Sequence, residues 1–205
     1  VGSFEKYKKR IQPYTAEGRG IVAAMENSTT ALDYDTRQLL KCLLGDFTGL
    51  VKNRQNKTEP LSTMNRVVKE LLKEQSFAYK MIKKLSLDDR EGDVRTVVAA
   101  VARTVFADGV NWGRVASLAA FGTAVCLYLK DKGVENCVEQ VGEEISSYLL
   151  TNQKDWLISN NSWDGFVEFF REPESRLRSN RLGTFAVGIV AILALCIVRV
   201  ALYNS

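Results

Sequence analysis

Residues 106–129 read FADGVNWGRVASLAAFGTAVCLYL, a turn-forming sequence followed by a run that carries no charge. The uncharged run, Val115 to Leu129, is 15 residues long. A helix that is apolar on every side must be buried on every side, and a membrane span needs about 20 residues. The stretch therefore predicts a helix at the centre of a helical bundle. Asp108 and Gly109 would end the preceding helix, and Asn111 would cap this one.

The chain on both sides of this run shows the apolar spacing of amphipathic helices. The segments with this pattern are 32–50, 62–72, 77–85, 93–107 and 135–150, with two shorter ones at 155–160 and 163–170. The expected N-cap of the first helix is Asp35 or Thr36, and that of the second is Ser62 or Thr63. Residues 52–60 read as a polar loop. The pattern predicts an all-α fold of about eight helices.

The domain organisation follows from where this pattern starts and stops. Residues 1–30 mix charge, glycine and polar residues, which favours a flexible arm, although part of it could be helical. Residues 31–172 would form the helical domain, and residues 173–181 a basic linker. A helix over 182–203 would be about 33 Å long at about 1.5 Å per residue, which matches a hydrocarbon core of about 30 Å. We expect a transmembrane tail anchor there, and the alternative is a buried last helix of the bundle.

The composition argues against an enzyme. The chain has no histidine, the commonest general base and metal ligand. Its four cysteines form no C-x-x-C pair, and no phosphate-binding glycine motif is present. A net charge of +4 is too mild for a nucleic-acid-binding surface. We therefore expect no catalytic residues, no metal, no cofactor and no nucleic acid.

Two motifs carry a resemblance to a known family. N-W-G-R at 111–114, followed by W-D-G-F at 163–166, resembles the first and second homology motifs of the Bcl-2 family of apoptosis regulators. Ser162 stands where the family has a glycine, a change expected to be tolerable. The segments M-x-R-V-V at 64–68 and VEFF at 167–170 look closest to the pro-survival Mcl-1 branch. The resemblance implies a Bcl-2-like bundle around the apolar helix.

The resemblance also implies a partner: an amphipathic BH3 helix of a pro-apoptotic family protein, held in an apolar groove. Arg114 would pair with an Asp of that helix. The residue types agree, because an arginine in the first turn of a helix opposes the helix dipole and favours a carboxylate partner. The alternative is an ion pair within the domain, for example with Asp108. By resemblance, the binding site consists of Asp108, Asn111, Gly113, Arg114, Met81, Leu85, Val101, Ala102, Val105, Ser117, Leu118 and Phe121.

Two other functions remain open. A membrane-permeabilising, pro-apoptotic effector of the same fold is the main alternative, since the apolar helix and its successor could form a membrane hairpin. Lys69 argues against it, because the third homology motif of the family has an Asp there. A tail-anchored adaptor without a groove is a further alternative. The expected location is the cytosolic face of the mitochondrial outer membrane, or else the endoplasmic reticulum or cytosol.

Overall fold

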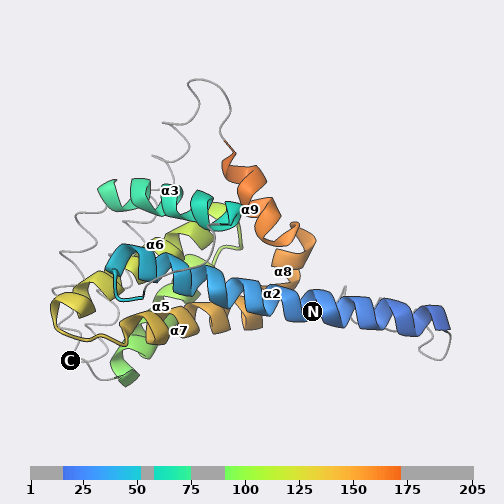
Figure 1. The fold of residues 1–205 in the computed structure, drawn as a ribbon, viewed down its shortest axis with the longest axis horizontal. Coiled ribbons are helices and arrows are strands. Elements are labelled where there is room, and N and C mark those ends of the chain that lie inside the picture. Colours follow the sequence, from blue (N-terminus) through green and yellow to red (C-terminus); the bar gives the residue numbers. More distant parts are fainter. Residues whose placement is uncertain (1–15, 52–57, 75–90, 172–205) are drawn as a thin grey trace.

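The computed structural model describes the backbone of residues 16–51, 58–74 and 91–171, and the side chains of 29–51, 58–73 and 94–171. These residues form seven helices and no strand, so the all-α prediction is confirmed for this part of the chain (Figure 1). The helices are α2 (Ala16–Thr48), α3 (Glu59–Glu74), α5 (Glu91–Val105), α6 (Trp112–Asp131), α7 (Cys137–Asn152), α8 (Lys154–Ser159) and α9 (Ser162–Phe170). The short helix expected over 77–85 and the tail anchor over 182–203 lie outside the described residues.

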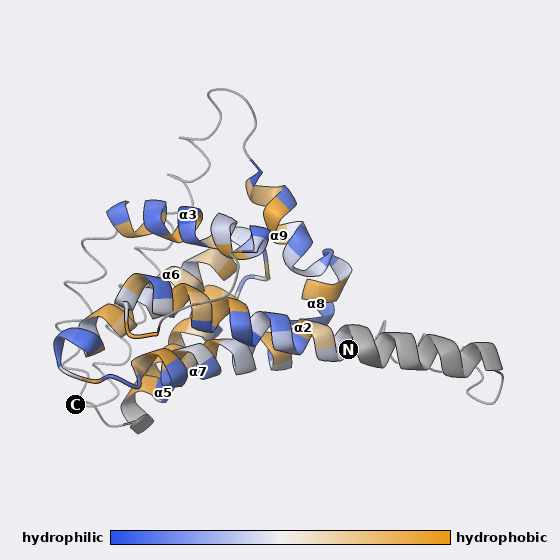
Figure 2. Ribbon diagram, in the orientation of Figure 1, coloured by the Kyte–Doolittle hydropathy of each residue, from blue (hydrophilic) through white to orange (hydrophobic). Residues whose placement is uncertain are grey.

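Helix α6 is the centre of the bundle, as its sequence predicts. It packs against α2, α3, α5 and α7, and its buried residues run from Trp112 to Leu129. Figure 2 shows hydrophobic residues concentrated along α6 and hydrophilic ones on the outer turns of α3 and α7. Within the described part, α6 is the one helix long and apolar enough to cross a membrane. However, 89% of the apolar stretch of α6 that meets this criterion is buried in the bundle, as expected of a core helix.

Both ends of α6 are set by local sequence. At the N-terminus, Asn111 has extended backbone (φ −156°), and its side chain accepts a hydrogen bond from the Arg114 backbone N–H at 2.9 Å. At the C-terminus, Gly133 has φ +84°, and the Val134 N–H reaches back to the Leu129 carbonyl at 3.0 Å. That is a Schellman arrangement, in which glycine readily adopts the left-handed conformation.

The N-terminal boundary differs from the sequence prediction. Helix α2 begins at Ala16, so part of the expected flexible arm is helical, and neither Asp35 nor Thr36 is an N-cap. Thr36 lies in mid-helix, is fully buried, and accepts a hydrogen bond from Trp163 Nε1 at 3.0 Å. A threonine hydroxyl serves equally as a cap or as a buried acceptor, and only the position of α9 distinguishes these roles.

The start of α3 also differs. The helix begins at Glu59, and Thr58 is its cap: Thr58 Oγ1 accepts the Leu61 N–H at 3.4 Å. The prediction of Ser62 or Thr63 was wrong because Pro60 was taken as the end of a loop. Proline has no N–H to lose in the first turn of a helix, so it fits there as well as in a loop.

Aromatic side chains join α8 and α9 to the start of α6. The Trp112 ring lies 4.7 Å from that of Trp156, 6.0 Å from that of Trp163 and 5.7 Å from that of Phe166, measured between centroids. Such edge-on and tilted contacts add about 0.5–1.5 kcal/mol per pair beyond the burial of area. The two homology-like motifs thus meet in space, and their contact holds the N-terminus of α6 in place.

Candidate partner-helix-binding site

Arg114 is held by the loop that enters α6. Its guanidinium donates from Nη1 to the Gly109 carbonyl oxygen at 2.6 Å. Gly109 has φ +105°, a conformation that L side chains rarely adopt. The Arg114 side chain is 23% exposed, so it is partly buried and still reaches the surface.

The ion pair between Arg114 and Asp108 is long. Nη2 of Arg114 is 3.8 Å from Oδ2 of Asp108, and the Asp108 side chain is 88% exposed. A pair of this kind is screened by water and contributes little, typically below about 1 kcal/mol. The two other predicted residues near Arg114 have structural roles: the Asn111 side chain caps α6, and the Gly113 carbonyl accepts the buried Ser117 hydroxyl.

The residues predicted to line the groove, as far as the structure describes them, lie on α5 and α6, two helices in contact. None of those that the structure describes is exposed. The residues are Val101, Ala102, Val105, Ser117, Leu118 and Phe121, and each is at most 3% exposed. The two others, Met81 and Leu85, lie outside the described residues. The described apolar part of the predicted site is therefore covered in this conformation, and the site itself stays a prediction.

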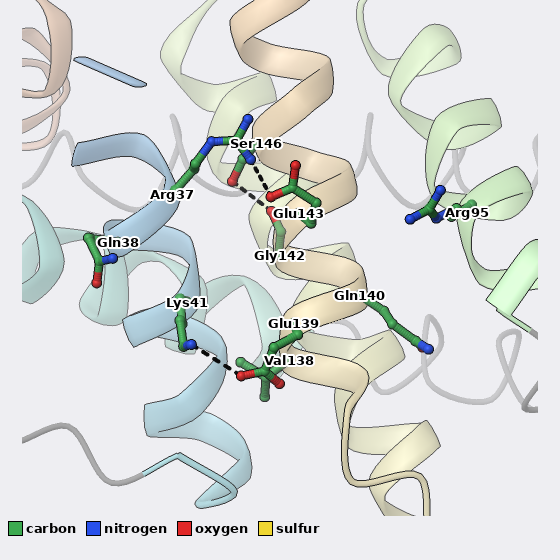
Figure 3. Close-up of a pocket in the computed structure, with 10 residues that line it drawn as sticks. All are labelled: Arg37, Gln38, Lys41, Arg95, Val138, Glu139, Gln140, Gly142, Glu143 and Ser146. Atoms are coloured by element: carbon green, nitrogen blue, oxygen red, sulfur yellow. Dashed lines mark hydrogen bonds and ion pairs between the residues drawn. The ribbon is translucent and has the colours of Figure 1, made fainter. Parts of the chain in front are cut away.

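A cavity that sequence reasoning missed lies over α7, between α2 and α5. It has a volume of about 400 Å³, and its charged lining residues are Arg37, Lys41, Arg95, Glu139 and Glu143. Figure 3 shows α7 running between the other two helices, with Arg37 and Lys41 on one side and Arg95 on the other. The signal was present, because residues 37 and 41 on α2 and 139 and 143 on α7 both have the i, i+4 spacing of one helix face.

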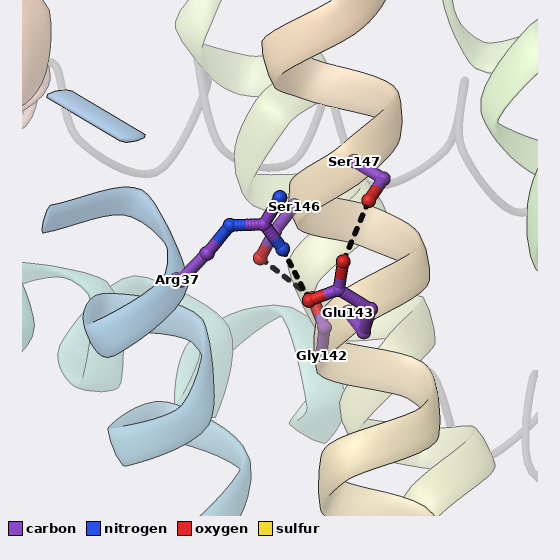
Figure 4. A network of polar contacts seen from close by, with 5 residues as sticks. All are labelled: Arg37, Gly142, Glu143, Ser146 and Ser147. Carbon is purple, nitrogen blue, oxygen red and sulfur yellow. Dashed lines mark hydrogen bonds and ion pairs between the residues drawn. The ribbon is translucent and has the colours of Figure 1, made fainter. Parts of the chain in front are cut away.

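Ion pairs cross from α2 to α7 along this cavity. Arg37 pairs with Glu143, and Lys41 Nζ lies 3.2 Å from Glu139 Oε1. Figure 4 shows Glu143 between Arg37 and Ser147, whose hydroxyl donates to Oε1 at 2.9 Å. The hydrogen bond from Arg37 lowers the pKa of the Glu143 carboxyl below its ordinary value of 4.5, and partial burial opposes this. These contacts join α2 to α7 and involve no residue of α6.

The site can be compared with known proteins now that its geometry is described. Residues 64–163 match the family described as "Apoptosis regulator proteins, Bcl-2 family". This stretch includes the Arg114 loop, all of α6 and the Trp163 contact. Over this stretch the chain is similar to the Bcl-2 family.

Relatives in this family are matched over part of their length. Apoptosis regulator R1 of Xenopus laevis is 34% identical over 114 residues, which are 52% of this chain and 50% of that protein. Human Bcl-2-like protein 1 is 36% identical over 70 residues, 34% of this chain and 30% of that protein. The Bcl-2 homologue of canarypox virus is 30% identical over 106 residues, 52% of this chain and 61% of that protein. The matches thus span from about a third to somewhat over half of these relatives.

A solved structure agrees with the fold. The zebrafish pro-survival protein NRZ in its apo form superposes with a TM-score of 0.60 at 24% sequence identity, covering 69% of this chain and 95% of that one. At this identity the likeness establishes the Bcl-2 fold alone. The branch within the family, predicted above as Mcl-1-like, remains a prediction.

Proposed function

We propose that this chain is a pro-survival regulator of the Bcl-2 family that sequesters BH3 helices of pro-apoptotic relatives and so restrains permeabilisation of the mitochondrial outer membrane. The ligand helix would bind beside α5 and α6, with apolar side chains at i, i+3 or i+4 and i+7 in the groove. An Asp on the ligand would pair with Arg114. The main partner is thus an amphipathic helix, and the lipid bilayer would be a second partner through residues 182–203.

The state of Arg114 is the observation that carries the proposal. A guanidinium offers five N–H donors, and one of them is engaged by the Gly109 carbonyl at 2.6 Å. Its carboxylate contact within the described residues, to Asp108, is long and water-exposed. The cation is thus held in position by a neutral acceptor and keeps donors for an incoming carboxylate. Such preorganisation reduces the entropy cost of binding.

The covered apolar residues add a kinetic expectation. Val105 and Phe121 are buried in this conformation, so a ligand helix can reach them only after the surrounding chain has moved. Association is slower when it requires a conformational change than when the ligand docks into an open groove. Association rate constants for such docking are typically about 10⁵–10⁷ M⁻¹s⁻¹. We expect association rates at or below the low end of that range.

A double-mutant cycle tests the role of Arg114. Arg114→Ala should weaken binding of a BH3 peptide by roughly thirty-fold or more, because breaking a buried charge pair costs about 2–5 kcal/mol. Replacing the peptide's Asp by Ala should weaken binding to the wild type by a similar factor, but binding to Arg114→Ala only slightly. Isothermal titration calorimetry of the four combinations gives the coupling energy.

Lys41→Ala is the matched control, because it removes one positive charge from the α2–α7 face. It should leave the affinity for the peptide unchanged within about two-fold, because the ion pair that it breaks, Lys41–Glu139, is exposed and contributes little. Additive losses in the cycle would show that Arg114 and the peptide Asp do not pair. Loss of folding in Arg114→Ala, seen by circular dichroism, would show instead that Arg114 is needed within the domain.

A further inference from the structure

Two cysteine thiols face each other at the end of the α6–α7 hairpin. Cys126 lies on α6 and Cys137 is the first residue of α7. The Cys126 thiol donates to the Cys137 carbonyl oxygen at 3.3 Å, and the Cys137 thiol donates to the Cys126 carbonyl oxygen at 3.5 Å. This reciprocal contact across 11 positions of sequence places each sulfur against the other residue.

The two thiols are chemically unequal. A hydrogen bond from the Cys126 thiol stabilises the Cys137 thiolate and lowers the pKa of Cys137, although burial opposes this. The backbone N–H groups of Cys137 and Val138, at the start of α7, act in the same direction. The same thiol contact, with burial, raises the pKa of Cys126. A sulfur with a lowered pKa beside a sulfur with a raised pKa is the arrangement of a reactive and a resolving cysteine.

We propose that Cys126 and Cys137 form a site of thiol oxidation, at which a hydroperoxide converts them to an intramolecular disulfide. The Cys137 thiolate attacks the peroxide O–O bond, which gives a sulfenic acid and releases the alcohol or water. The Cys126 thiol then attacks the sulfenic sulfur, the S–S bond forms and water leaves. Two thiols are oxidised and one peroxide is reduced, so the equation balances.

Access to the buried sulfurs is through the turn between the helices. Both cysteines are fully buried, but Lys132, Gly133, Glu135 and Asn136 of the turn are exposed. Asn136, at the N-cap position, makes no side-chain capping bond to α7, so the first turn of that helix lacks this stabilisation. A peroxide is nearly as small as water. We expect slow oxidation, and the product would tie α6 covalently to α7.

Peptide mapping of the full-length chain in detergent micelles tests the site. The protein is treated with hydrogen peroxide, denatured in iodoacetamide and digested without reduction. The expected product is a peptide pair linked through Cys126 and Cys137, lighter than the two thiol peptides by about 2 Da because two hydrogens have left. Dithiothreitol should reverse the link. Cys42 should be recovered as the alkylated thiol.

Variants separate the two roles. In Cys126→Ser the resolving thiol is missing, so dimedone should trap a sulfenic acid at Cys137. The matched control is Cys42→Ser, which removes a buried cysteine of α2 and should form the 126–137 link at the wild-type rate. Recovery of both wild-type thiols in alkylated form after prolonged peroxide would overturn the proposal. Linkage of either one mainly to Cys42 or Cys196 would overturn it too.

Discussion

At the residue scale, the second homology-like motif depends on backbone conformations that the sequence only partly reveals. Asn161 and Ser162, at the start of α9, have φ of +61° and +49°. The chain then brings Gly165 against the carbonyl of Asn160. The tight turn between α8 and α9 places Trp163 and Phe166 against Trp112, so this strain supports the aromatic contact that holds α6.

Gly165→Ala should destabilise the fold. An added Cβ would lie 1.9 Å from the Asn160 carbonyl oxygen, a backbone atom that cannot move aside alone. We expect a loss of about 1–3 kcal/mol in the free energy of unfolding, measured by urea denaturation. The matched control is Gly142→Ala in α7, whose Cβ would meet only Leu44 Cδ1 at 3.5 Å. That variant should be neutral or stabilised by up to about 1 kcal/mol.

Ser162→Gly should stabilise the protein. The sequence resemblance treats serine here as tolerable, and the structure adds that its φ is +49°, where an L side chain costs roughly 1 kcal/mol. Glycine removes that cost but gains entropy in the unfolded chain, so we expect a net gain of about 0.5 kcal/mol by thermal and urea denaturation. Ser162→Ala keeps the Cβ and should show no gain. Equal stabilisation by alanine and glycine would argue that the serine hydroxyl, not φ, is the unfavourable feature.

At the element scale, polar contacts between helices set how the elements are joined. Lys130 of α6 donates to the carbonyl of Thr48 at the end of α2, and Arg66 of α3 donates to the carbonyl of Phe170 at the end of α9 at 2.7 Å. Basic side chains thus satisfy carbonyls at two helix C-termini. Ion pairs join α2 to α7. Among them, the Arg37–Glu143 pair has the clearest consequence for stability.

The Arg37–Glu143 pair should make stability depend on pH. The folded-state pKa of Glu143 is lowered. The stabilisation of the fold by this pair is therefore present at pH values above the unfolded-state pKa of about 4.5, and it is lost as the pH falls through the folded-state pKa. Both side chains are about half exposed, so we expect the pair to contribute roughly 0.2–1 kcal/mol to the free energy of unfolding at about pH 7. The free energies of unfolding of wild type and Glu143→Gln, measured by urea denaturation, should therefore differ at about pH 7 and converge as the pH falls below the folded-state pKa.

Arg37→Met is the partner control for this pair. It should reproduce the loss seen in Glu143→Gln, and the double variant should lose little more, because either change already breaks the contact. A difference between wild type and Glu143→Gln that persists undiminished below the folded-state pKa would contradict the role assigned to the ionised carboxylate.

At the scale of the whole molecule, the helical domain is organised around one buried helix. Helix α6 contacts four other helices, and these contacts account for its burial without a membrane. Membrane attachment would then be a property of residues 182–203, which lie outside the described residues.

Deleting residues 180–205 should release the protein from membranes without changing its peptide affinity. The removed segment includes 17 successive residues without charge, and a span of that composition resists extraction. Carbonate extraction followed by immunoblotting measures attachment, and calorimetry with a BH3 peptide measures binding. Persistent membrane association of the truncated chain would assign the anchor to another part of the protein.

The sequence alone determined the central helix, the Asn111 cap, the turn at Gly109 and the order of the surrounding helices. These are properties of one segment at a time: an uncharged run must be buried, and caps and turns depend on neighbouring residues. The start of α2 was misjudged because Thr36 has the residue type of a cap. Its real partner is Trp163, 127 positions away.

Only the tertiary structure decided which side chains meet between helices. The Arg37–Glu143 pair and the facing thiols of Cys126 and Cys137 depend on how helices cross and rotate. Helix crossing is set by the interlocking of whole side-chain rows, which no local periodicity encodes. For the same reason, the burial of Val105 and Phe121 in this conformation was decided by the packing around them.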